Sequence, residues 1–275
     1  MRRPRFRKFL RMPTAIIGLV ILAVVVLSAI FAPYLTPYEP THQDLLHRVA
    51  PPNFEHLLGT DHLGRDVLTR LLYGARISLF TGFVSVGIGL LLGMIVGLTA
   101  GYFGGRTDNA LMSMMDVLLG FRTYLLAILV VAILGTSLFN LTIAIGTATF
   151  PQFARMVRSE VLSVRSRDFV EAARALGARD VVLIGRHVFP QVLGPTVVMA
   201  TFFVATAIVI ESSLSFLGLG PPPPTPSWGL MINEGRRYIL DDAWLPAIPG
   251  FAIMLVVLAF NLLGDALRDV LDPRI

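Results

Sequence analysis

Residues 168–177 read DFVEAARALG and form a polar island in an otherwise apolar chain. Their spacing predicts a short helix whose apolar face consists of Phe169, Val170, Ala173 and Leu176. Glu171 and Arg174 turn away from that face. We expect Asp168 to cap the amino end, with Glu171 in capping-box position, and Gly177 to close the helix through a left-handed turn. A short, sharply bounded helix of this kind is typical of a segment that docks onto another surface.

The same stretch opens a longer pattern, E-A-A-x3-G-x12-P, that runs from Glu171 to Pro190. This pattern closely resembles the cytoplasmic loop of bacterial ATP-binding-cassette (ABC) importer permeases. In that family the loop is a coupling helix that sits in a cleft of a separate ATPase subunit. The alternative is an ordinary loop between two helices. The residues that the resemblance assigns to ATPase coupling are Asp168, Glu171, Ala172, Ala173, Arg174, Leu176, Gly177 and Pro190.

The composition is that of a membrane protein. Hydrophobic residues make up 55% of the 275 residues and charged residues only 15%, against about 25% charged in ordinary soluble domains. The basic residues are not interleaved with aromatic ones, which argues against nucleic-acid binding. The chain has no G-x4-G-K-[ST] motif, so it is not itself a P-loop ATPase. Because it has no cysteine, disulfide and metal-thiolate sites are excluded.

Six apolar runs predict an all-α polytopic fold with six transmembrane helices. Their expected positions are 15–32, 77–100, 111–134, 138–153, 192–219 and 244–263. Both termini are expected in the cytoplasm, because this topology places 16 basic residues inside and six outside. We divide the chain into residues 1–76, which hold the amino terminus, the first span and an external segment, and a core of residues 77–275. The core carries the coupling loop at 155–191.

The external segment ends in a second motif, GTDHLGRD, at residues 59–66. The pattern G-T-D-x-L-G-R-D closely resembles the segment after the first span in dipeptide, oligopeptide and nickel permeases of the C type. Residues 211–220 and the tail at 265–274 resemble the same permeases. An amphipathic helix at the membrane interface, without a role in substrate binding, is expected to carry Arg70, Tyr73 and Arg76.

Glycines recur at four-residue intervals in the second expected span, at Gly89, Gly93, Gly97 and Gly101. Such a stripe lets another helix approach closely, because packing rather than hydrophobicity holds helices together in lipid. The partner is either a neighbouring helix of this bundle or a second permease. Pro151, in the fourth span, is expected to kink its helix.

Three charged residues lie within expected spans, where charges are costly and therefore candidates for function. Asp116 is expected to reach the cytoplasmic interface. Arg122 lines a polar pathway or pairs with an acid; it stands where the family commonly has proline, so the residues leave open whether the helix bends there. Glu211 faces a water-filled translocation path or hydrogen-bonds neighbouring helices, and the two alternatives have equal weight.

Two further features concern the loops. Residues 221–228 (PPPPTPSW) form a stiff external loop, because consecutive prolines favour an extended conformation. Within it, Pro224 and Trp228 are candidate contacts for a binding protein. In the coupling loop, His187 is expected to be structural rather than a metal ligand.

The four motifs together resemble the permease subunit (C type) of a bacterial dipeptide, oligopeptide or nickel ABC importer. The resemblance implies the type I ABC importer permease fold, a prokaryotic plasma (inner) membrane location and half of a translocation pore. It also implies four partners: a second homologous permease, two cytoplasmic ATP-binding subunits and an external substrate-binding protein. The chain needs no cofactor, since ATP and Mg would be bound by the ATPases. The alternatives are a nickel or glutathione importer of the same family, a secondary transporter working alone, or a membrane scaffold.

Overall fold

The computed structural model describes residue 9 and residues 11–271. The expected cytoplasmic amino terminus and the last residues of the expected tail therefore lie largely outside the described part. The described residues are mostly helical and contain no β-strand. The helices are α2 (Pro13–Ile30), α3 (Ala32–Leu35), η1 (Leu45–His47), α4 (Val67–Phe103), α5 (Gly105–Leu119), α6 (Thr123–Leu134), α7 (Leu138–Arg165), α8 (Asp168–Ala175), α9 (Asp180–Val182), the π-helix η2 (Leu183–Val188), α10 (Phe189–Phe216), α11 (Trp228–Gly235), η3 (Arg236–Tyr238) and α12 (Trp244–Leu271).

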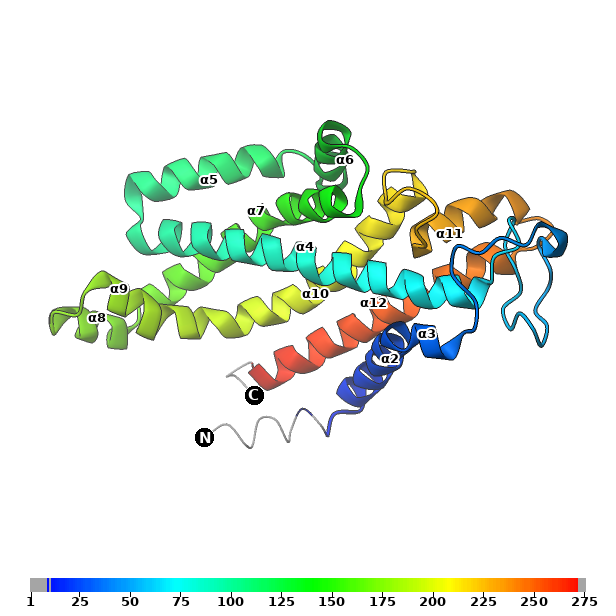
Figure 1. The fold of residues 1–275 in the computed structure, drawn as a ribbon. Helices are drawn as coiled ribbons and strands as arrows, with labels where there is room; N and C mark the ends of the chain where they lie inside the picture. The colour runs from blue at the N-terminus through cyan, green and yellow to red at the C-terminus, as the bar shows by residue number, and fades with distance from the viewer. Residues whose placement is uncertain (1–8, 10, 272–275) are drawn as a thin grey trace.

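Figure 1 shows an elongated molecule with two distinct ends. Helices α8 and α9 lie at one end, while α3, α11 and the loops around them lie at the other. Helix α4 runs lengthwise between the two ends, and α2 packs against α12. We refer to the end that holds α8 as the loop end, and to the end that holds α11 as the cap end.

Helices occupy all six expected span positions, but they are not equally apolar. Four helical stretches are long and apolar enough to cross a membrane: Pro13–Ile30, Val67–Phe103, Asp180–Phe216 and Trp244–Leu271. The pair α5 and α6 makes a fifth if it is counted as one bent span. Helix α7, at the fourth expected position, is less apolar than these four, because threonine, glutamine and arginine are interspersed among its apolar residues. The chain is a multi-pass membrane protein.

The expected third span at 111–134 is wrong as a single helix. Helices α5 and α6 meet at an angle of 86°, with the break at Gly120, Phe121 and Arg122. Arg122 has φ −61° and ψ 140°, which takes the backbone out of the helix. A proline ring would hold the same φ. The bend implied by the family is therefore present without its proline.

The glycine stripe of α4 packs against α7 of the same chain. A Cβ added to Gly93 would lie 2.4 Å from Cβ of Phe153, and one added to Gly97 would lie 2.6 Å from the carbonyl oxygen of Ala154. Only glycine permits this approach, as expected for helices that associate in lipid. The prediction of a packing face is confirmed, and its partner is a helix of this bundle.

Candidate functional site

Helix α8 lies at the loop end of the molecule and ends as the sequence predicts (Figure 1). Gly177 has φ +81°, in the left-handed region. Its amide donates to the carbonyl oxygen of Arg174 at 2.9 Å, and the amide of Ala178 donates to the carbonyl oxygen of Ala173 at 3.1 Å. These two bonds form a Schellman motif, which satisfies carbonyls at the end of the helix. The left-handed turn at Gly177 is confirmed.

The start of α8 differs from the prediction. The residue that caps the helix is Arg167, in extended conformation, and no side chain accepts a capping hydrogen bond there. Asp168 is already the first helical residue, so the expectation that it caps the helix is wrong. Its carboxylate, like that of Glu171, lies in the first turn, where negative charge interacts favourably with the helix dipole.

The apolar face of α8 is divided between two surroundings. Val170 is buried and Ala173 is partly buried, and both pack with apolar residues of α7 and η2. In contrast, Phe169 is 41% exposed and Leu176 is 89% exposed. The predicted apolar face is therefore only partly covered by this chain, because a helix of eight residues contacts the rest of the chain along one side only.

The exposed residues of this loop form an uncovered apolar surface. Besides Phe169 and Leu176, it includes Val181, which is 82% exposed, and Val182. Glu171 and Ala172 are also exposed. Large exposed apolar residues at one end of a folded protein are candidates for an interaction site. Pro190, the last residue of the pattern, lies in the first turn of α10, directly after the π-helix η2.

At the cap end, the GTDHLGRD motif folds into a tight turn. Gly64 has φ +74°, and a Cβ there would lie 1.7 Å from the carbonyl oxygen of Asp44. The Thr60 hydroxyl accepts from the amide of Ala50 at 2.8 Å. Asp66 caps α4 by accepting from the amide of Thr69 at 2.7 Å. The motif thus builds the external segment and starts α4.

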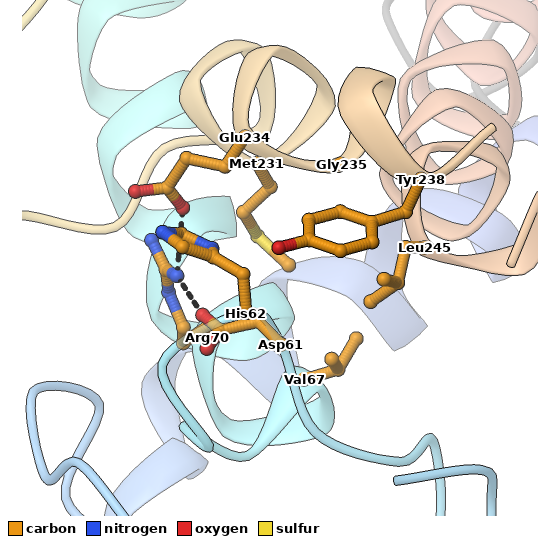
Figure 2. Close-up of a pocket in the computed structure, with 9 residues that line it drawn as sticks. All are labelled: Asp61, His62, Val67, Arg70, Met231, Glu234, Gly235, Tyr238 and Leu245. Carbon is orange, nitrogen blue, oxygen red and sulfur yellow. Dashed lines mark hydrogen bonds and ion pairs between the residues drawn. The ribbon is translucent and has the colours of Figure 1, made fainter. Parts of the chain in front are cut away.

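Arg65 of this motif and Arg70 of α4 form a buried ion-pair network with two acids. Figure 2 shows Arg70 between the two acids, Asp61 and Glu234. Arg65 donates from Nε to Oδ2 of Asp61 at 2.7 Å and from Nη2 to Oε2 of Glu234 at 2.9 Å. Arg70 donates from Nη1 to the same Glu234 oxygen at 2.8 Å and also contacts Asp61. Both arginines are 1% exposed. The expectation of an interfacial helix is wrong for Arg70, because α4 begins at Val67 and turns this side chain inward.

The pKa values of Asp61 and of the neighbouring His62 are both lowered. Burial alone would raise the pKa of Asp61, but the charges of Arg70 and Arg65 hold that pKa below its ordinary value. Burial lowers the pKa of the neighbouring His62, although Glu234 and Asp61 lie nearby.

Asp61, His62 and Glu234 bring possible metal-ligand atoms within 4.8 Å of one another. However, the carboxylate oxygens in the network already accept from guanidinium groups, so the two acids are balanced by two arginines. A dication would add uncompensated buried charge, and we assign none to this cluster. The small cavity that these residues line, about 10 Å³, matches one water molecule, and Nε and Nη2 of Arg70 have no protein partner among the described residues.

The three charged residues of the expected spans have different surroundings. Asp116 pairs with Arg155 on α7 at 2.5 Å, and both side chains are more than half exposed. Arg122 is exposed at the break between α5 and α6, and none of the ion pairs in the described part of the chain involves it. Glu211 is fully buried and accepts hydrogen bonds from Ser78 of α4 at 2.9 Å and from Ser215 at 2.8 Å. The hydrogen-bonding alternative for Glu211 matches this geometry.

The two residues predicted to contact a binding protein, Pro224 and Trp228, differ in exposure. Pro224 is exposed. Trp228 is 1% exposed, and its Nε1 donates to the carbonyl of Leu71 at 3.0 Å. Its indole packs against Gly74 of α4. The expectation that Trp228 contacts a binding protein is wrong, because the residue anchors α11 to α4.

Two residues of these sites were not predicted from the sequence. Glu234, which joins both buried arginines, lies in a short helix with no motif of its own. Tyr102 directly follows the glycine stripe and contacts the coupling loop. For Tyr102 a signal was present, because a tyrosine after Gly101 ends the smooth face that α7 packs against.

Comparisons with known proteins find families and relatives that together match most of the chain. The family described as "Binding-protein-dependent transport system inner membrane component" matches residues 89–275, and the "N-terminal TM domain of oligopeptide transport permease C" matches residues 4–52. The dipeptide transport system permease protein DppC of Alkalihalophilus pseudofirmus is 44% identical over 99% of this chain and 90% of that protein. The di/tripeptide permease DppC of Pseudomonas aeruginosa is 42% identical over 94% and 87%.

A further relative and a solved structure extend the comparison. The glutathione transport system permease protein GsiD of Pectobacterium atrosepticum is 41% identical over 99% of this chain and 91% of that protein. A solved chain of the MetNI methionine ABC transporter, described as inward facing, matches with a TM-score of 0.57 and 22% identity, over 73% of this chain and 95% of that one. At this identity the match shows a shared fold.

Proposed function

Because the chain belongs to the binding-protein-dependent transport system inner membrane component family, we propose that it is the permease subunit of an ATP-driven importer of small peptides. It forms half of a translocation pore in a bacterial plasma membrane, with both termini in the cytoplasm. The observation that carries this proposal is the uncovered apolar surface of the coupling loop. A helix held by its own chain on one side and exposed on the other fits a docking element.

The proposed ATPase contact consists of the exposed side of α8 and the turn that follows it. Leu176 and Phe169 supply the apolar contact, and Ala172 lets a partner approach closely. Gly177 closes the helix, so that the chain returns toward α10. ATP and Mg are bound by two cytoplasmic ATPase subunits, and ATP binding draws the coupling loops of the two permeases together.

The remaining partners are a second, related permease and an external substrate-binding protein. The cap end, opposite the loop end, is the proposed landing surface for the binding protein (Figure 1). Pro224 is exposed in the proline-rich loop there. The buried ion-pair network at the same end joins α11 to α4 and to the residues just before it.

Glutathione is the second candidate substrate, because GsiD is about as similar to the chain as the DppC proteins are. Glutathione is itself a small peptide with free carboxylates, so the two substrates share much of their chemistry. Specificity in an assembly of this kind lies mostly with the binding protein.

The test begins with the chain, tagged at its carboxyl end, purified from membranes in mild detergent. Mass spectrometry is expected to find a second permease, P-loop ATPases and a binding protein. The complex is then reconstituted in liposomes, and ATP-dependent uptake of a labelled dipeptide is compared with uptake of labelled glutathione. A chain that is recovered alone and whose uptake follows a proton gradient would contradict the proposal and favour a secondary transporter.

A further inference from the structure

Tyr102, at the loop end of α4, contacts three charged residues of the coupling region. Its hydroxyl donates to Oδ1 of Asp180 at 2.5 Å and accepts from Nη2 of Arg174 at 3.4 Å. The guanidinium groups of Arg174 and Arg165 lie 5.8 and 5.9 Å from the centre of its ring. The tyrosine itself is only 3% exposed. One buried tyrosine therefore contacts charged residues of both signs, one acid and two arginines.

The three partners come from three different elements. Arg165 ends α7, Arg174 lies in α8 and Asp180 begins α9. Arg165 also reaches the carbonyl of Gly101, directly before the tyrosine, at 3.5 Å. The segments before, within and after the coupling helix thus converge on one residue of α4. Cation–π contacts of arginine and hydrogen bonds of a tyrosine hydroxyl both depend on orientation as well as distance. These contacts therefore fix how the loop is oriented on α4.

Helix α4 continues without a break from this contact to the cap end. It spans 37 residues, which corresponds to about 55 Å at the rise of an α-helix. Near its other end, Arg70 lies in the buried network with Asp61 and Glu234. The coupling loop and the external cap are therefore attached to opposite ends of the same helix, the loop by partly buried polar contacts of Tyr102 and the cap by a buried ion-pair network.

We propose that Tyr102 is a positioning residue that fastens the coupling helix to α4, so that movement of the loop is transmitted along α4 to the external cap. The inference rests on the proposed function, because it assigns a route for the coupling that an importer requires. A route through α10, which continues from the loop through η2, is the competing path. Side-chain contacts of Tyr102 would then contribute only to packing.

The decisive variant is Tyr102→Phe, which removes the hydroxyl and keeps the ring. We expect unchanged recovery of the complete complex and unchanged thermal stability, continued ATP hydrolysis, and about fivefold fewer substrate molecules transported per ATP, as for the loss of one hydrogen-bonded contact. Asp180→Ala should give a similar loss. The double variant Tyr102→Phe with Asp180→Ala should lose no more than either change alone, because both act on one contact.

Tyr34→Phe serves as the matched control, because this tyrosine is 86% exposed at the cap end. It should transport as well as the wild type. If the wild-type complex does not assemble or transport, the proposed function fails. If the wild type transports and Tyr102→Phe keeps the same transport per ATP as Tyr34→Phe, only the inference fails. A Tyr102→Phe variant that loses complex and uptake in equal proportion, with transport per ATP unchanged, also overturns it, because a purely structural role predicts that result.

Discussion

Arg70 on α4 and Glu234 on α11 are 164 residues apart in the chain, yet their side chains meet in an ion pair of 2.8 Å that is almost closed to solvent. Arg65 donates to the same Glu234 oxygen at 2.9 Å. One carboxylate therefore balances part of the charge on two buried guanidinium groups. Its removal would leave those groups without sufficient counter-charge.

Glu234→Ala is expected to destabilise the protein by roughly 3–5 kcal/mol, because breaking a buried pair leaves an uncompensated charge. Glu234→Gln should be less damaging, since it keeps the shape and one acceptor. Thermal unfolding in detergent would measure both. Asp241→Ala is the control, because this acid is exposed and takes part in no ion pair of the described chain. Equal stability of the Glu234→Ala and Asp241→Ala variants would contradict the network.

The low pKa of Asp61 predicts a loss of stability in acid. Its pKa in the folded protein lies below the ordinary value of 3.8, because Arg70 and Arg65 outweigh burial. A lowered pKa contributes stability that is fully present above the unfolded value and is lost as the pH falls through the folded value. We therefore expect the cap end to weaken below about pH 4.

Hydrogen exchange of residues 59–66 between pH 3 and 6 would follow this change. Asp61→Asn should be less stable near neutral pH and should show a flatter dependence on pH in the acidic range, because its side chain does not titrate. An equally steep dependence in the variant would assign the acid sensitivity to other carboxylates.

Two glycines of α4 provide a matched test of helix packing. A Cβ at Gly93 would lie 2.4 Å from Cβ of Phe153 and 2.8 Å from the amide nitrogen of Ala154. Gly93→Ala must push α7 away and is expected to cost about 1–3 kcal/mol, as overpacking does elsewhere. Gly87→Ala has nothing within 4 Å of the new Cβ and should be neutral or slightly stabilising. If both variants unfolded at the same temperature, the close approach of α4 and α7 would be wrong.

Features with a local signature were predictable from the sequence, and contacts between distant segments were not. The turn at Gly177 and the stripe through Gly93 follow from spacing along one helix. The contact of Glu234 with Arg70, in contrast, depends on how α11 packs on α4 after both have formed. Trp228 shows the same limit: a proline-rich loop predicts an exposed segment, but only the packed bundle shows that its last residue is buried against Gly74.

Gly177→Val tests the turn that closes the coupling helix. Because Gly177 has φ +81° and nothing lies within 4 Å of an added Cβ, the cost comes from the backbone alone. It amounts to about 1–2 kcal/mol, which corresponds to roughly 5–30-fold in population, so uptake should fall while the fold remains intact. Gly177→Asn should retain more transport, since asparagine tolerates the left-handed region. Gly185→Ala, in the same loop with open space around it, should transport normally. Full uptake by Gly177→Val would show that this turn is not required.

The two halves of the α8 apolar face should respond differently to charge. Leu176→Asp introduces a carboxylate at a position that is 89% exposed, so the isolated chain should keep its thermal stability. If Leu176 contacts an ATPase, loss of a buried leucine worth about 1.5–3 kcal/mol should weaken ATPase binding by about 10–100-fold. Val170→Asp places the charge against α7 and should destabilise the chain itself. Titration of the purified chain with the ATPase separates the two effects. Unchanged ATPase affinity of Leu176→Asp would mean that the partner docks on another part of the loop.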